Sequence, residues 1–188
     1  MEGIDILRVI TGIAKGYKLK TVKGLNTRPT SDKVKGALFN ILAGRIEGSS
    51  VLDLFAGTGN LGIEALSRGA DLAVFIDKSP ESISVIKENL KHTRLEDKAT
   101  VIPGDVLVIL KKMSIVHKKY DIIFMDPPYN KNLVQETLKI IEENDIINEK
   151  GIIVAERSVK DDIGINLEKL KLFREQRYGD TVLSFFTR

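Results

Sequence analysis

From residue 50 onward, short apolar runs alternate with amphipathic segments, and this alternation constrains the fold more than any other feature of the sequence. The runs have the length and composition of buried strands, and each of the first four is followed by apolar residues at helical spacing. Strands are expected at 51–55, 72–76, 99–102, 120–125 and 151–155, with helices ending near 67, 91, 112 and 143. This alternation predicts an α/β fold with a parallel, doubly wound sheet.

Both ends of the chain depart from the alternation. Residues 170–177 and 181–186 flank Tyr178-Gly179-Asp180, so the last two strands are expected to form an antiparallel hairpin. Near the N-terminus, Leu7–Ile10 and Tyr17–Lys20 flank a glycine-containing turn, which predicts a small β-hairpin. The whole is therefore expected to be a Rossmann-like, mostly parallel seven-stranded sheet that ends in an antiparallel hairpin, with an N-terminal β-hairpin extension.

One helix is expected between the N-terminal hairpin and the first strand of the sheet. Its predicted range is 31–43, with an apolar face made of Val34, Ala37, Leu38, Ile41 and Leu42. A boundary before this helix divides the chain into a basic hairpin extension at 1–26 and an α/β domain at 27–188.

Composition excludes several kinds of site. The 188 residues include no cysteine and two histidines, which excludes disulfides, thiolate metal sites and cysteine nucleophiles, and we expect no metal centre. No apolar run approaches the roughly 20 residues that span a bilayer. The acidic N-terminus lacks the apolar region of a secretory signal. A cytoplasmic enzyme or binding protein, without a membrane partner, is therefore expected.

The positive charge is concentrated at one end of the chain. Residues 1–36 hold eight basic and three acidic residues, a net charge of +5, whereas the whole chain carries +3. A basic segment on a near-neutral body is typical of polyanion binding, although a solvated lysine face has the same composition. The candidate nucleic-acid contacts are Arg8, Lys15, Lys18, Lys20 and Arg28.

A glycine-rich turn follows the first expected strand of the sheet. Gly57, Gly59 and Gly62 satisfy G-x-G-x-x-G, and Asp77 lies 20 residues after Gly57, where it can accept hydrogen bonds from a ribose. NAD, FAD and S-adenosylmethionine all carry such a ribose. Asp53 at the entrance of the turn favours S-adenosylmethionine, because a carboxylate attracts the methionine ammonium and repels a pyrophosphate.

Three further residues complete the candidate cofactor site. Phe55 lies within the glycine turn, and Lys78 follows Asp77. Asp105 follows the third expected strand, at the edge where open α/β sheets bind ligands. It can accept from an adenine amino group or serve only as a helix cap.

The tetrapeptide Asp126-Pro127-Pro128-Tyr129 ends the fourth expected strand and is the most informative motif. The prolines fix the backbone and remove two N–H donors, which leaves carbonyl and carboxylate oxygens as acceptors. These acceptors can orient an NH2 group on a planar substrate and stabilise positive charge as its nitrogen attacks a methyl carbon. The Tyr129 ring can stack on the same substrate.

Together these segments resemble the class I S-adenosylmethionine-dependent methyltransferases, and within them the RsmD family. The segments that carry the resemblance are Arg8–Gly12, Gly16–Leu19, Arg28–Lys35, Asp53–Ala70 and Asp126–Tyr129. The resemblance implies that 27–188 is a class I methyltransferase domain. It also implies methyl transfer to N2 of one guanine in small-subunit (16S) ribosomal RNA.

The resemblance also implies residue roles and a partner. Asp53, Gly57 and Gly59 would hold the methionine end of the cofactor, Asp77 the ribose, Asp105 the adenine, Asp126 and Pro127 the target amine, and Tyr129 the guanine ring. The basic hairpin would contact RNA phosphates. The implied substrate is the protein-bound small subunit, and a monomer suffices for the chemistry.

Other activities share parts of this pattern. Adenine-N6 DNA methyltransferases have the same tetrapeptide, and a protein glutamine amide is a further possible acceptor, but about 25 residues of hairpin leave little room to read a DNA sequence. An NAD-dependent oxidoreductase would need a hydride-transfer acid or base that the sequence does not show. In a non-catalytic RNA-binding module the tetrapeptide would be superfluous.

Overall fold

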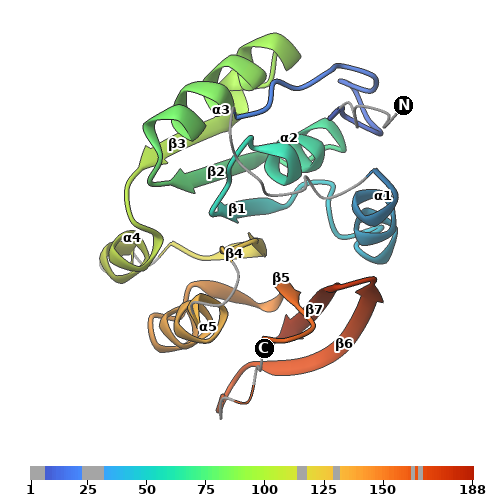
Figure 1. The fold of residues 1–188 in the computed structure, drawn as a ribbon. Coiled ribbons are helices and arrows are strands. Elements are labelled where there is room, and N and C mark those ends of the chain that lie inside the picture. Colours follow the sequence, from blue (N-terminus) through green and yellow to red (C-terminus); the bar gives the residue numbers. More distant parts are fainter. Residues whose placement is uncertain (1–6, 23–31, 114–117, 129–131, 162–163, 165–166) are drawn as a thin grey trace.

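The alternation of strands and helices is the main feature of the computed structural model, which describes residues 7–22, 32–113, 118–128, 132–161, 164 and 167–188 (Figure 1). The elements are α1 (Asp32–Ile41), β1 (Ser50–Leu54), α2 (Asn60–Ser67), β2 (Leu72–Asp77), α3 (Pro80–Thr93), η1 (Glu96–Lys98), β3 (Ala99–Pro103), α4 (Val106–Met113), β4 (Tyr120–Met125), α5 (Leu133–Glu143), β5 (Ile147–Ser158), β6 (Lys171–Tyr178) and β7 (Thr181–Thr187). Among these helices, none has the length and apolar character that a membrane span requires.

The described strands form one seven-stranded sheet in the order β3-β2-β1-β4-β5-β7-β6. Strands β1 to β5 pair in parallel, and β7 pairs antiparallel with β5 on one side and with β6 on the other. The expected fold class is thus confirmed, including the terminal hairpin. β5 is longer than the expected 151–155, and β6 is the edge strand, with a register shift between Leu172 and Arg174.

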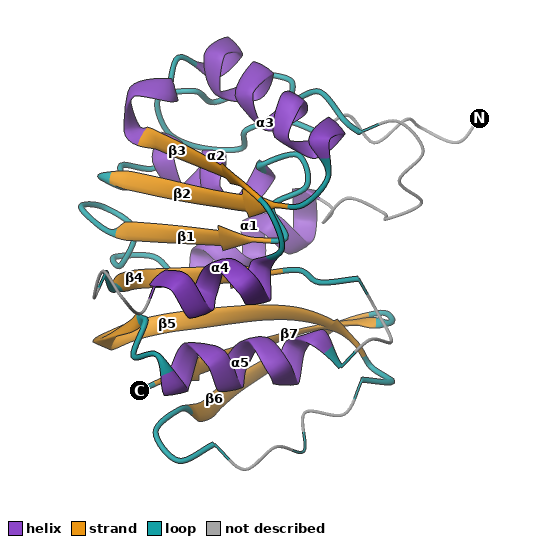
Figure 2. Ribbon diagram, turned by 90° about the vertical axis from the view of Figure 1, so that its left-hand side faces the viewer, coloured by secondary structure: helices purple, strands orange, loops and turns teal. Residues whose placement is uncertain are grey.

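Helices cover both faces of the sheet. Figure 2 shows α4 and α5 on one face and α1, α2 and α3 behind the other. Successive strand residues serve opposite faces, as the pleat requires. Val51 and Phe75 belong to the core under α1–α3, whereas Leu52 and Val74 belong to the core under α4 and α5.

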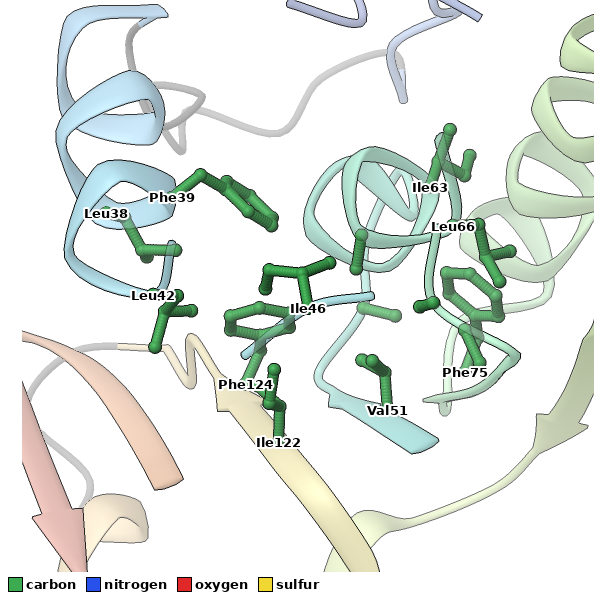
Figure 3. Close-up of a cluster of buried hydrophobic side chains, with 14 of the residues drawn as sticks. Leu38, Phe39, Leu42, Ile46, Val51, Ile63, Leu66, Phe75, Ile122 and Phe124 are labelled. Atoms are coloured by element: carbon green, nitrogen blue, oxygen red, sulfur yellow. The ribbon is translucent and has the colours of Figure 1, made fainter. Parts of the chain in front are cut away.

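The apolar face of α1 agrees in part with the expected one. Leu38, Phe39 and Leu42 are fully buried and point toward Ile46 and Phe124 (Figure 3). Val34, Ala37 and Ile41 of the expected face are only partly buried. The buried face also contains Lys35, whose side chain is fully buried 3.2 Å from the equally buried carboxylate of Glu64. The expected face is therefore confirmed at Leu38 and Leu42, with Val34 and Ile41 packed against the same core, and it lacked the buried Lys35 and Phe39.

Residues 7–22, called the hairpin segment below, form the predicted antiparallel arrangement with a single bridge, Arg8 to Lys18. The N–H of Val9 donates to the carbonyl of Tyr17 at 2.9 Å, and that of Leu19 donates to Leu7 at 2.8 Å. Figure 1 shows the segment running over α2 and α3. Its buried side chains Leu7, Val9, Ala14 and Leu19 belong to the core under α1–α3.

Gly12 fixes how the hairpin segment sits on α2. Its φ is +91°, and a Cβ there would lie 1.7 Å from the carbonyl oxygen of Ser67, the last residue of α2. The N–H of Ile13 donates to that same oxygen at 2.9 Å. Only glycine allows this approach of the two backbones.

Candidate active site at the carboxyl edge of the sheet

Four acidic residues lie toward the carboxyl ends of four neighbouring strands. Asp77 ends β2, Asp126 follows β4, and Asp53 and Glu156 lie within β1 and β5. Leu54 pairs with both Ile76 and Met125, and Met125 pairs with Ala155, so the register brings the four acids to the same edge. Open α/β sheets bind ligands at this edge.

The glycine turn between β1 and α2 has an unusual backbone. Phe55, Gly57 and Gly59 have φ values of 58°, 55° and 76°, in the left-handed region that favours glycine. One carboxylate oxygen of Asp77 accepts from the Gly57 N–H and the other from the Ser79 N–H, both at 2.8 Å. Asp77 therefore holds the turn against the start of α3, and its predicted ribose contact stays a prediction.

Asp53 is buried beneath this turn. Its carboxylate accepts from the N–H of Gly62 at 2.9 Å, and the side chain is almost inaccessible. Burial raises the pKa of Asp53 to about 8, with a further contribution from Asp77, although the Gly62 bond opposes the rise. A Cβ on Gly62 would lie 2.3 Å from the Phe75 ring and 3.1 Å from the Asp53 carboxylate, so glycine is required here.

Asp126 and Glu156 influence each other electrostatically. Asp126 is half-buried and Glu156 is almost fully buried. Burial, together with the charges of Glu156 and Asp53, raises the pKa of the Asp126 carboxyl well above its ordinary value. Such a cluster of buried acids favours a cationic ligand, because a positive charge relieves the repulsion among them.

The other candidate residues occupy varied surroundings. Pro127 is buried and Lys78 exposed, and Phe55 packs against the core under α4 and α5. Asp105 is exposed and caps α4, since its carboxylate accepts from the N–H groups of Leu107 at 3.0 Å and Val108 at 3.2 Å. Asp105 thus has the capping role considered as an alternative, and its adenine contact stays a prediction. Tyr129 and Arg28 lie outside the described residues.

The basic residues of the hairpin segment are solvent-exposed, but two of them have acidic partners. Arg8 lies 2.9 Å from Asp32, and Lys20 pairs with Glu88 on α3. Lys15 and Lys18 have no ion-pair partner among the described residues. These two lysines therefore have the charge most available to a polyanion.

Sequence reasoning missed three buried polar residues between the hairpin segment and the glycine turn: Lys35, Glu64 and Asn89. The Glu64 carboxylate accepts from the N–H groups of Ile10 at 2.7 Å and Thr11 at 3.0 Å and also pairs with Arg68. Lys35 occurs at spacings of three, four and seven from the buried Leu38, Phe39 and Leu42, a signal that could have identified it.

A family model described as "Conserved hypothetical protein 95" matches residues 7–187. The chain belongs to this family. It is the RsmD family that the sequence motifs resembled, so that prediction is confirmed. The "Ribosomal RNA small subunit methyltransferase D" of Escherichia coli strain K12 is 32% identical over 187 residues, covering 100% of this chain and 92% of the relative.

Two further relatives extend the comparison. The protein of the same name from Haemophilus influenzae is 34% identical over 174 residues, covering 92% of this chain and 89% of the relative. Among solved structures, a hypothetical protein of Thermus thermophilus superimposes with a TM-score of 0.84 at 28% identity, covering 97% of this chain and 100% of the other. The likeness to known proteins therefore extends over sequence and fold, and the match to the family model includes the hairpin segment.

Proposed function

We propose that this protein transfers a methyl group from S-adenosylmethionine to the exocyclic N2 amine of a guanine in 16S ribosomal RNA. The observation that carries the proposal is the half-buried carboxyl of Asp126, followed by buried Pro127, beside the acids of the carboxyl edge. Its relatives named as small-subunit rRNA methyltransferases support the substrate class. The proposed substrate is the protein-bound small subunit. We propose that the enzyme acts on it as a monomer, in the cytoplasm.

The residues at the carboxyl edge fit S-adenosylmethionine. The cofactor carries an ammonium and a sulfonium, and the buried acids Asp53 and Glu156 supply complementary charge. A pyrophosphate of NAD or FAD would be repelled by the same charges. In the proposal, Asp53, Gly57 and Gly59 hold the methionine end, Asp77 the ribose and Asp105 the adenine. When bound, the cofactor supplies an electrophilic methyl carbon on sulfur.

Orientation of the target amine is the main chemical role proposed for the protein. The N2 lone pair of guanine is delocalised into the ring, so the amine is a weak nucleophile. The carboxylate of Asp126 and the carbonyl of Pro127 accept hydrogen bonds from its two N–H groups and stabilise the positive charge that develops on nitrogen. The nitrogen gains a bond to the methyl carbon as the carbon–sulfur bond breaks and S-adenosylhomocysteine leaves, and the nitrogen then releases a proton to water. Tyr129 is proposed to stack on the base.

The substrate assignment is tested with labelled S-adenosylmethionine and four acceptors in separate reactions: small ribosomal subunits, naked 16S rRNA, genomic DNA and bulk protein. We expect label in the subunits, and N2-methylguanosine after digestion of their rRNA to nucleosides. Label confined to DNA would indicate an adenine-N6 enzyme, and label confined to protein a glutamine methyltransferase. Absence of transfer together with NAD binding would reject the methyltransferase class.

Cofactor affinity is expected to rise with pH between about 6 and 7.5, below the Asp53 pKa of about 8. A cationic ligand favours ionised Asp53, so binding lowers this pKa and releases a proton, and the affinity gain can approach tenfold per pH unit. Calorimetric titrations at pH 7 in buffers of different ionisation enthalpy would count the released proton. The Asp53→Asn variant should lose this pH dependence. An equally steep dependence in that variant would assign the proton to another group.

Replacing Lys15 and Lys18 with Ala is expected to weaken subunit binding and flatten its salt dependence. Each lost phosphate contact should reduce the slope of log K against log salt by about 0.7–0.9, through counterion release. Lys20→Ala should change the slope less, because Glu88 already offsets its charge. Filter binding at several salt concentrations measures the slopes, with exposed Lys139→Ala on α5 as control. Unchanged slopes in the double variant would place the RNA surface elsewhere.

A further inference from the structure

One buried side chain contacts both the hairpin segment and the glycine turn. Asn89 of α3 is 1% exposed. Its amide oxygen accepts from the N–H of Lys20 at 2.8 Å. Its amide NH2 donates to the carbonyl of Lys20 at 3.1 Å and to the carbonyl of Thr58 at 2.9 Å. Thr58 lies between Gly57 and Gly59, so a single amide joins the backbone of the proposed RNA-binding segment to the backbone of the proposed cofactor turn.

A second buried side chain makes a parallel connection. The Lys35 ammonium donates to the carbonyl of Arg8 at 2.5 Å and to the amide oxygen of Asn60 at 2.6 Å. Asn60 is the first residue of α2, directly after the glycine turn. The hairpin segment is thus linked to the glycine turn at two points, through Lys35 at Arg8 and through Asn89 at Lys20. The second link joins residues that lie 69 positions apart in the sequence.

We infer that Asn89 is a positioning residue that couples RNA binding at the hairpin segment to cofactor binding at the glycine turn. The inference rests on the proposed function. If RNA binding moves the backbone of Lys20, the Asn89 amide must either move with it or lose a buried hydrogen bond. The same amide also donates to the carbonyl of Thr58, so the movement reaches the glycine turn. Each ligand therefore fixes a group that the other ligand needs, which makes the second binding step more favourable.

The coupling has a quantitative consequence. If subunit binding tightens cofactor binding by some factor, the cofactor tightens subunit binding by the same factor. Coupling between sites is typically about 5–150-fold. We expect the wild type to show at least about fivefold in both directions.

Equilibrium dialysis with labelled S-adenosylhomocysteine measures the factor directly. Its affinity is determined with and without small subunits isolated from cells that lack the enzyme. In Asn89→Leu, which removes both the donor and the acceptor, the factor should fall below about twofold, compared with at least about fivefold in the wild type. Because the factor is a ratio, a uniformly weakened cofactor site does not change it, and neither does lower stability in a variant that stays folded without ligand.

Ser67→Ala is the matched control. The buried Ser67 hydroxyl also anchors the hairpin segment, accepting from the N–H of Ala14 at 3.0 Å and donating to the carbonyl of Thr11 at 2.7 Å. It lies at the end of α2 opposite the glycine turn. This variant should bind subunits more weakly but keep both the cofactor affinity of the free protein and the coupling factor.

The outcomes separate this inference from the proposed function. A wild type that methylates subunits with a coupling factor near one would overturn the inference alone, as would an Asn89→Leu variant with the wild-type factor. A wild type that transfers no methyl group to subunits would overturn the proposed function instead. If Asn89→Leu does not fold, Asn89→Asp decides, because it keeps the acceptor for Lys20 and removes the amide donor to Thr58.

Discussion

Replacing Asp126 with Ala is expected to lower methyl transfer by about 10²–10³-fold, the usual loss when one preorganised stabilising group is removed from a reaction centre. Cofactor affinity should stay close to that of the wild type, because the glycine turn and Asp77 are untouched. Isothermal titration with S-adenosylhomocysteine, beside a methyl-transfer assay on small subunits, separates the two effects. Asp71→Ala is the control, since this exposed acid precedes β2 at the opposite edge of the sheet.

The same carboxyl predicts the pH dependence of turnover. Only the ionised form of Asp126 supplies the negative charge that stabilises the developing cation, and burial and Glu156 raise its pKa. Methyl transfer should therefore increase as the pH is raised toward that pKa, and Asp126→Asn should lack the increase. Wild-type turnover in either variant would remove Asp126 from the mechanism.

Replacing Lys35 with Met is expected to lower the free energy of unfolding by about 3–5 kcal/mol, the usual cost of removing one partner from a buried ion pair. Glu64 would keep Arg68 and two backbone N–H groups, but Asn60 and the carbonyl of Arg8 would lose their shared donor. Urea unfolding measures the change as a shift of the midpoint at constant slope.

The matched control is Lys139→Met. Lys139 also pairs with a glutamate on a helix, but both side chains are mostly exposed and the ion pair measures 3.8 Å. Its replacement should change stability by less than about 0.5 kcal/mol. A Lys35→Met variant as stable as this control would show that the buried ammonium contributes little.

Strand ends were the part of the site most accessible from sequence. Asp77 and Asp126 could be assigned to one edge because the carboxyl ends of parallel strands meet there, whatever the lengths of the connecting helices. Whether the Glu156 side chain is buried could not be predicted, because β5 extends beyond its apolar centre and pairs there with β7, which comes later in the chain.

The hydrogen-bond partners of the buried polar side chains could not be predicted from local patterns. Lys35 bonds to Asn60, 25 residues away, and Asn89 bonds to Lys20, 69 residues away. These partners come together only when α1, α2, α3 and the hairpin segment pack against one another. Periodicity shows which face of a helix is apolar. It does not show which polar side chain will form a hydrogen bond with another helix or strand.

Strand β6 lies at one edge of the sheet, so one of its sides has no neighbouring strand. Its sequence and geometry affect how two molecules can associate in solution. The register shift between Leu172 and Arg174 interrupts the regular ladder, and Lys171, Arg174 and Arg177 place positive charge along the strand. Bulges and charged side chains on outer strands disfavour the addition of a strand from another molecule. Concentrated samples of this protein should therefore resist growth by edge-to-edge pairing of their outer strands.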